Sequence, residues 1–209
     1  MKNAYLTLPS PFPVEHRLVY IWPVLRWPRY DQDQDAIGPE LSRAIDLILS
    51  RHPDKRGLIH SVSYKRTELL LRHCLSQRLL EYDRSEPFDH AIKRLASTPG
   101  GVLVSPRATE GIDLKNDHSE LQVFLKLPFK LLGDDRVKKR KETDQDWYAL
   151  MTAIAIVQGS GRSIRTLSDV APTYILDAAW PYWFRVNGHF FPRYFRDAIR
   201  PFSPPQPTS

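Results

Sequence analysis

Short apolar runs alternate along this chain with longer segments in which apolar residues recur at helical spacing. The short runs are rich in β-branched and aromatic residues and are bounded by turn-forming residues, which predicts buried strands. These predicted strands lie at residues 18–22, 58–62, 79–82, 102–104, 121–126 and 174–177. Helices are expected at 38–52, 67–80, 88–96 and 144–157, with further partly helical, aromatic-rich segments at 180–184 and 191–195.

Two of these helices show a clear inward-facing stripe. The predicted buried positions are Leu41, Ile45, Ile48 and Leu49 in the first helix and Leu69, Leu70, Leu71 and Leu75 in the second. Strands that alternate with helices of this length predict an α/β fold with a mostly parallel, doubly wound sheet. Ligands of such sheets bind beyond the carboxyl ends of the strands. We therefore expect Ser61, Ser63, residues 105–113 and the residues after Val157 to lie along one edge.

The composition is that of a soluble globular domain: of the 209 residues, 42% are apolar and 26% are charged. No apolar run approaches the roughly 20 residues of a membrane span and the N-terminus lacks a signal-like core, so the expected location is cytoplasmic, without a membrane partner. We find no repeat or internal linker. One domain is expected over residues 1–200, followed by a disordered tail at 201–209 with four prolines.

Cysteine and histidine usage argues against a metal centre. Cys74, the one cysteine, lies among leucines and is expected to be a buried, unreactive thiol. The seven histidines show no metal-ligand spacing, so no metal site is predicted within the chain.

The net charge is +6 and the sequence pI is about 9.5, which permits nucleic-acid binding without requiring it. Basic residues concentrate at positions 136–141, which are either a solvated, mobile loop or a phosphate contact. An N-terminal group of aromatic and basic side chains has two interpretations, packing of the first strand or a surface for single strands. Its members are Trp22, Arg26, Trp27, Arg29 and Tyr30.

Residues 158–165 read Gln-Gly-Ser-Gly-Arg-Ser-Ile-Arg and follow the apolar helix predicted at 144–157. If the helix continues through them, Arg162 and Arg165 lie one turn apart on one face. Two guanidiniums there would suit phosphate oxygens, because each is planar and permanently charged. From the residues alone, a solvated arginine pair on a helix is the more ordinary interpretation.

This stretch resembles motif VI of superfamily 2 helicases, and two upstream stretches resemble the motifs that come before it. Residues 103–114, with the core Glu-Gly-Ile-Asp at 110–113, look like motif V of the DinG and XPD branch. Residues 57–64 look like motif IV, and Pro9 to Pro13 with Arg17 resembles the start of the second motor domain in DinG-like helicases. The ordered set covers nearly the whole chain, from about residue 11 to 199.

The resemblance implies a three-layer, RecA-like (P-loop NTPase-like) domain with helices on both faces of the sheet. It implies that Arg162 and Arg165 act as arginine fingers in ATP hydrolysis and that Gln158 positions the nucleotide or the attacking water. Gly161, Asp113 and Glu110 would lie at the nucleotide; a buried brace to an arginine is the structural alternative for Asp113. Relatives in this branch commonly carry an iron-sulfur cluster, which one cysteine cannot hold.

Several parts of an ATPase are missing from the sequence. There is no Gly-x-x-x-x-Gly-Lys-Ser/Thr loop and no Asp-Glu-x-His run, both of which belong to the first motor domain. ATP and Mg²⁺ would therefore be shared with an N-terminal helicase motor domain, in cis or in trans, and the isolated chain is expected to be inactive. The implied activity of the assembled helicase is ATP-driven translocation along single-stranded DNA.

The predicted DNA side rests on hydroxyls and cations at strand ends, which would contact a phosphate backbone without reading sequence. These candidates are Ser61, Ser63, Tyr64, Arg107 and Thr109. Capping of the following helix is an equally good explanation for Ser63. The alternative function for the chain is a non-enzymatic, helicase-like module that docks protein or nucleic acid.

Overall fold

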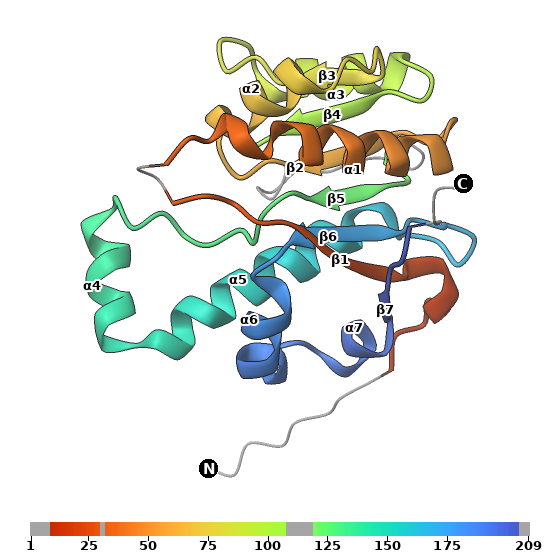
Figure 1. Ribbon diagram of the computed structural model, residues 1–209. Coiled ribbons are helices and arrows are strands. Elements are labelled where there is room, and N and C mark those ends of the chain that lie inside the picture. Colours follow the sequence, from red (N-terminus) through yellow and green to blue (C-terminus); the bar gives the residue numbers. More distant parts are fainter. Residues whose placement is uncertain (1–8, 30–31, 108–118, 205–209) are drawn as a thin grey trace.

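Seven parallel strands form one sheet in the order β3-β4-β2-β5-β6-β1-β7 (Figure 1). This computed structural model describes residues 9–29, 32–107 and 119–204. The strands are β1 (Val19–Leu25), β2 (Gly57–His60), β3 (Leu79–Glu81), β4 (Val102–Ser105), β5 (Gln122–Phe124), β6 (Thr173–Asp177) and β7 (Ile199–Pro201). The predicted α/β class, with a parallel sheet, is confirmed.

Helices cover both faces of the sheet, as a three-layer domain requires. The helices are α1 (Gly38–Arg51), α2 (Tyr64–His73), α3 (Phe88–Ser97), α4 (Asp135–Thr143), α5 (Gln145–Ser160), α6 (Trp180–Asn187) and α7 (Arg193–Asp197). Short 3-10 turns are η1 (Val14–Arg17), η2 (Asp35–Ile37), η4 (Gly161–Ser163) and η5 (Gly188–Phe190).

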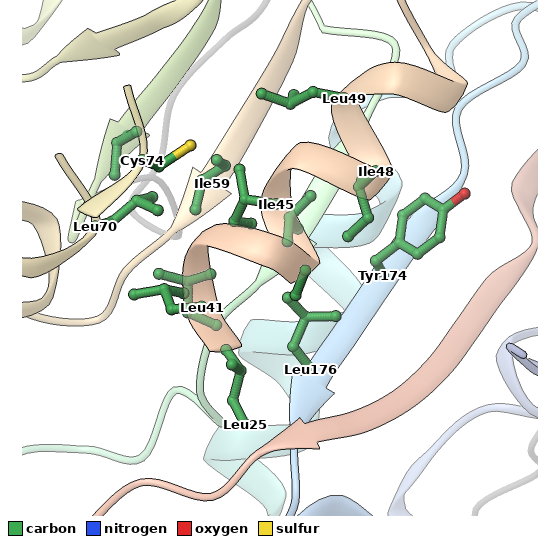
Figure 2. Close-up of a cluster of buried hydrophobic side chains, with 14 of the residues drawn as sticks. Leu25, Leu41, Ile45, Ile48, Leu49, Ile59, Leu70, Cys74, Tyr174 and Leu176 are labelled. Carbon is green, nitrogen blue, oxygen red and sulfur yellow. The ribbon is translucent and has the colours of Figure 1, made fainter. Parts of the chain in front are cut away.

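One face of the sheet packs against α1 and α2. The predicted stripe of α1 is fully buried, with Ile45 and Ile48 lying over Ile59 of β2 and Tyr174 and Leu176 of β6 (Figure 2). Because successive residues of a strand point to opposite faces, Phe124 and Ile175 are buried on the other side. There they pack with Ala153 and Ile156 of α5, Trp180 of α6 and Phe195 of α7.

The second predicted stripe is partly wrong. Leu69 and Leu70 are buried, but α2 ends at His73 and Leu75 is 88% exposed. Cys74, the C-cap, has an extended backbone that turns the chain away from the helical path before Leu75. The Cys74 thiol itself is buried, as predicted, and burial raises its pKa to about 11, so it stays protonated at neutral pH.

The basic run at 136–141 is helical rather than a loop. It lies in α4, which has no buried residue and stands at one side of the molecule (Figure 1). Its N-terminus is capped by Asp134, whose side chain accepts a hydrogen bond from the amide of Arg136 at 2.9 Å. Cation-π contacts tie its last turn to α5, because Arg140 lies 4.2 Å from the Trp147 ring centroid.

Order continues beyond the domain boundary expected at residue 200. Pro201 ends β7, which pairs with β1 and was not predicted. The next residue, Phe202, is 9% exposed and its ring centroid lies 5.0 Å from that of Trp22. Phe202, which lies in the segment expected to be disordered, is therefore part of the core. Residues 205–209 lie outside the described residues.

Candidate functional site

Helix α5 positions the arginine-containing segment, which follows directly after its C-terminus. Its N-terminus is capped by Asp144, whose carboxylate accepts from the amide of Trp147 at 2.9 Å. Near its C-terminus, Gly159 fits closely against the sheet, because a Cβ there would lie 2.6 Å from Cζ of Phe124. Gln158 is exposed and lines a groove of about 590 Å³ with His60, Val62 and Pro106, which follow or end β2 and β4.

The helix does not continue through both arginines, so the condition for placing them on one helical face is not met. Arg162 lies in the 3-10 turn η4, and the next residue but one, Ile164, is extended with φ −115° and ψ 105°. Arg165 is exposed and lies in an irregular segment. That segment is braced by Asp169, whose Oδ2 accepts from the amides of Arg165 at 2.8 Å and Thr166 at 2.7 Å.

The two guanidiniums are nevertheless close enough to interact. Partial burial lowers the pKa of Arg162 below its ordinary value, and the positive charge of Arg165 lowers it further. A guanidinium remains charged at any working pH. Two like charges held together favour an anion between them, which is the property that a phosphate site needs.

A buried polar cluster lies beneath this segment and was not predicted from the sequence. Gln122 Nε2 donates to the hydroxyls of Ser119 at 2.6 Å and Ser163 at 2.7 Å, and Ser163 Oγ donates to Ser119 Oγ at 3.0 Å. Gln122 Oε1 pairs with His60 Nε2 at 2.7 Å. All four side chains are buried, and Ser163 lies between Arg162 and Arg165 in the sequence. The signal for this cluster was present in the sequence as two polar residues, His60 and Gln122, inside apolar strand runs.

The cluster also corrects the expectation that all the motifs share one edge. Ser163 contacts Gln122, the first residue of β5, and Ser119, which precedes that strand. As a crossover between parallel strands, α5 runs antiparallel to them and returns the chain to their amino ends. The arginine segment around Ser163 therefore reaches the amino end of β5. Gln158, one turn earlier on α5, still lines the groove with residues that end or follow β2 and β4 at the carboxyl edge.

His60 is fully buried against this cluster, with its ring stacked on Phe124 at a centroid distance of 4.1 Å. Burial lowers the pKa of His60 from 6.5 to about 4, against the raising effect of the Gln122 hydrogen bond; the charge of Arg162 lowers it further. The imidazole is therefore neutral at physiological pH. With Nε2 as donor to Gln122 Oε1, the ring nitrogen Nδ1 has no hydrogen-bond partner within the described residues.

The lowered pKa predicts acid sensitivity. Between pH 6.5 and 4 the unfolded chain binds a proton at His60 that the folded chain does not, so the unfolding free energy falls as pH is lowered. We expect His60 to contribute a loss of about 2 kcal/mol between pH 7 and 5. Urea unfolding of wild type and His60→Gln across this range measures it; the variant, which keeps a polar group but cannot titrate there, should lose less.

His52 makes the comparison with the variant necessary, because burial also lowers its pKa to about 4. Both chains contain His52, so its contribution cancels in the difference. Equal loss of unfolding free energy in wild type and His60→Gln would contradict the assignment to His60.

The residues predicted to contact DNA differ in burial and in hydrogen bonding at the carboxyl edge. Ser61 is completely buried and its hydroxyl bonds to that of Thr67 at 2.7 Å, so it does not face a ligand. Ser63 caps α2 by accepting from the amide of Arg66, and it also accepts from Nη1 of Arg66 at 3.0 Å. Tyr64 is half-buried, with the guanidinium of Arg84 lying 5.5 Å from its ring centroid.

Arg107 is exposed after β4, and its Nη1 donates to the hydroxyl of Tyr82 at 3.1 Å. It thus lies over the β3–β4 side of the edge, toward α3. Three predicted residues of motif V, Thr109, Glu110 and Asp113, lie outside the described residues. The structure therefore places Gly161 and Arg162 in η4 close to Arg165, with Gln158 one turn earlier on α5. Ser63, Tyr64 and Arg107 lie at the carboxyl edge.

The aromatic and basic group of the N-terminal strand is explained by packing at both of its tryptophans. Trp22 contacts Phe202, and Trp27 Nε1 donates to the carbonyl of Leu125 at 2.8 Å. The described parts of the chain contain no group of three acidic, histidine or cysteine side chains suited to a metal ion. Nor does any helix in those parts have the length and apolar character of a membrane span.

Comparison with known proteins connects this geometry to a family. Residues 48–192 match the family profile described as the helicase C-terminal domain. Over 136 residues the chain is 24% identical to the regulator of telomere elongation helicase 1 homolog of Caenorhabditis elegans, covering 57% of this chain and 13% of that protein.

Two solved structures share the fold. Xpd4 of S. tokodaii superimposes with a TM-score of 0.64 at 19% identity, over 97% of this chain and 41% of that one. A structure of apo XPD gives a TM-score of 0.62 at 16% identity, over 82% of this chain and 38% of that one. The chain therefore spans less than half the length of each of these three relatives.

Proposed function

Because the chain belongs to the helicase C-terminal domain family, as a domain of the XPD and DinG kind, we propose that it is the second motor domain of an ATP-dependent DNA helicase. In this proposal it works with an N-terminal motor domain, in cis or in trans, which supplies the phosphate loop and the ligands for Mg²⁺. Its own part is to place cations at the nucleotide and to hold single-stranded DNA.

The observation that carries the proposal is the arginine pair after α5. Arg165 lies close enough to Arg162 for its positive charge to lower the pKa of Arg162, and the segment between the two residues is anchored in the core through Ser163. A pair of fixed cations is what stabilises the charge that develops on the γ-phosphate during transfer. Gln158, exposed one turn earlier on α5, would help to position the nucleotide or the attacking water.

The two activities would use opposite ends of β5. The arginine segment lies beside its amino end, so the first motor domain would present its nucleotide there. The DNA would run along the carboxyl edge, past Ser63, Tyr64 and Arg107. Separate ends allow one domain to hold both ligands at once, which a translocating motor must do.

The proposal predicts a clear difference between the isolated and assembled chain. Alone, it should bind single-stranded DNA weakly and hydrolyse no ATP, because the phosphate loop is missing from its sequence. Adding an N-terminal motor domain of its family should give ATP hydrolysis that single-stranded DNA stimulates. ATPase and DNA binding are measured in the same samples at two salt concentrations. Hydrolysis by the isolated chain, or none after assembly, would contradict the proposal.

A further inference from the structure

Two half-buried cationic side chains, neither of them among the predicted DNA contacts, lie near each other at the carboxyl edge of the sheet. Lys126 follows β5 by two residues, and Arg66 lies in the first turn of α2. The guanidinium carbon of Arg66 lies 4.8 Å from the ring centroid of Trp27, just beyond β1. Because the Trp27 indole is itself fixed by its bond to the Leu125 carbonyl, the ring holds the arginine in place.

The negative charge around Arg66 and Lys126 does not balance their two positive charges. The carboxylate that influences both is Asp177, at the end of β6. Its oxygens already accept from the amides of Leu127 at 2.9 Å and Ala179 at 3.0 Å. Among the residues that the structure describes, no carboxylate forms an ion pair within 4.0 Å of either cation. One carboxylate therefore faces two positive charges.

The hydrogen-bonding capacity of the pair is also unused. Nη1 of Arg66 donates to Ser63 Oγ, but its Nε is buried with no partner in the described ranges. Lys126 makes no side-chain hydrogen bond there. Burial lowers the pKa of both groups, and the charge of Arg66 lowers that of Lys126 further. Half-buried cations with spare hydrogen-bond donors bind an anion favourably, because part of the free-energy cost of removing water from them is already included in the folded state.

We propose that Arg66 and Lys126 form a binding site for a backbone phosphate of single-stranded nucleic acid. This inference rests on the proposed function and adds a contact to its DNA side. The source of the phosphate follows from position, because Lys126 lies beyond the carboxyl end of β5 and the arginine segment lies beside the amino end. We therefore assign the phosphate at Lys126 to the nucleic acid, and the comparison of DNA with inorganic pyrophosphate below tests the nucleotide as its source. The site contacts phosphate alone and reads no base.

The test is the binding of a fluorescent oligothymidylate by the isolated chain over a series of salt concentrations. Lys126→Ala and Arg66→Gln should each weaken binding about 3- to 10-fold at low salt and reduce the slope of log affinity against log salt by about 0.7. Lys126→Arg, which keeps the charge, should retain most of the affinity. The matched control is Lys93→Ala, which removes the same charge from an exposed position on α3 and should change little.

Circular dichroism and the midpoint of thermal unfolding show that the variants are folded. If wild type binds the oligonucleotide and Lys126→Ala and Arg66→Gln behave like Lys93→Ala, this inference is wrong while the proposed function stands. If the variants lose affinity for inorganic pyrophosphate but not for DNA, the anion is not a nucleic-acid phosphate and the inference also fails. If wild type binds no single-stranded DNA even at low salt, the inference falls together with the DNA part of the proposed function.

Discussion

Replacing Arg165 by alanine should reduce the ATPase rate of the assembled helicase by about 10³- to 10⁵-fold, the usual contribution of an arginine that contacts the transferred phosphoryl group. The same loss is expected for Arg162→Ala. Arg165 is the sharper test, because its side chain is exposed and alanine there should leave the fold unchanged. The measurement is kcat for ATP hydrolysis with saturating single-stranded DNA.

Two comparisons separate a chemical role from a general charge effect. Arg165→Lys keeps the positive charge but loses the planar fork, so it should recover only a small part of the rate. Arg43→Ala, on the exposed surface of α1, removes an arginine remote from the segment and should leave kcat unchanged. Near-normal turnover in both Arg162→Ala and Arg165→Ala would remove the observation on which the proposed function depends.

The fold was largely predictable because its strands and helices obey local rules. The buried stripe of α1 follows from Leu41, Ile45, Ile48 and Leu49 at helical spacing, and all four are in the core. Helix ends were less predictable. The end of α2 depends on the backbone at Cys74, and no proline or glycine in the sequence marks it before Leu75.

Long-range pairing explains the other errors in the fold. The strand β7 has three residues, and its partner β1 lies at the other end of the chain, so no local pattern indicates it. Phe202 looks like part of a proline-rich tail in sequence, yet it packs with Trp22 and Tyr174. Contacts of this kind depend on tertiary structure, which overrides a composition typical of disorder.

The sequence motifs identified residues of the candidate site, but the position predicted for them in the fold was wrong. The motifs brought Gln158, Arg162 and Arg165 into consideration, but the expectation of a common edge treated the end of α5 as if it followed a strand. Arg66 and Lys126 were missed because each looks like an ordinary surface residue in sequence. Their shared position depends on three strand ends and one helix meeting at one edge.

Gln122→Leu should both destabilise the fold and slow the assembled helicase. Leucine fills nearly the same volume, so the loss comes from hydrogen bonds to His60, Ser119 and Ser163 rather than from a cavity. The two serines still bond to each other at 3.0 Å, whereas the Nε2–H of His60 is left buried without an acceptor. We expect the unfolding free energy to fall by about 3 kcal/mol, as measured by urea unfolding.

A second substitution shows whether the stranded imidazole is the cause. In His60→Phe/Gln122→Leu neither partner is polar, so much of the lost stability should return. Thr152→Val is the matched control in α5, because it removes a buried hydroxyl bonded to the Tyr148 carbonyl, away from the arginine segment. It should cost about 1 kcal/mol and leave the ATPase unchanged. No recovery in the double variant would show that the loss does not come from His60.

The effect on turnover follows from the place of Ser163 between the two arginines. Once Gln122 is gone, the turn η4 loses its anchor to β5, and the arginines are held less accurately at the nucleotide. We expect kcat to fall about tenfold with the KM for ATP nearly unchanged, because accurate placement matters most in the transition state. The double variant should regain stability without regaining turnover, since it removes the unsatisfied imidazole at position 60 but does not restore the bond to Ser163. Recovery of both together would mean that Gln122 acts on the fold alone.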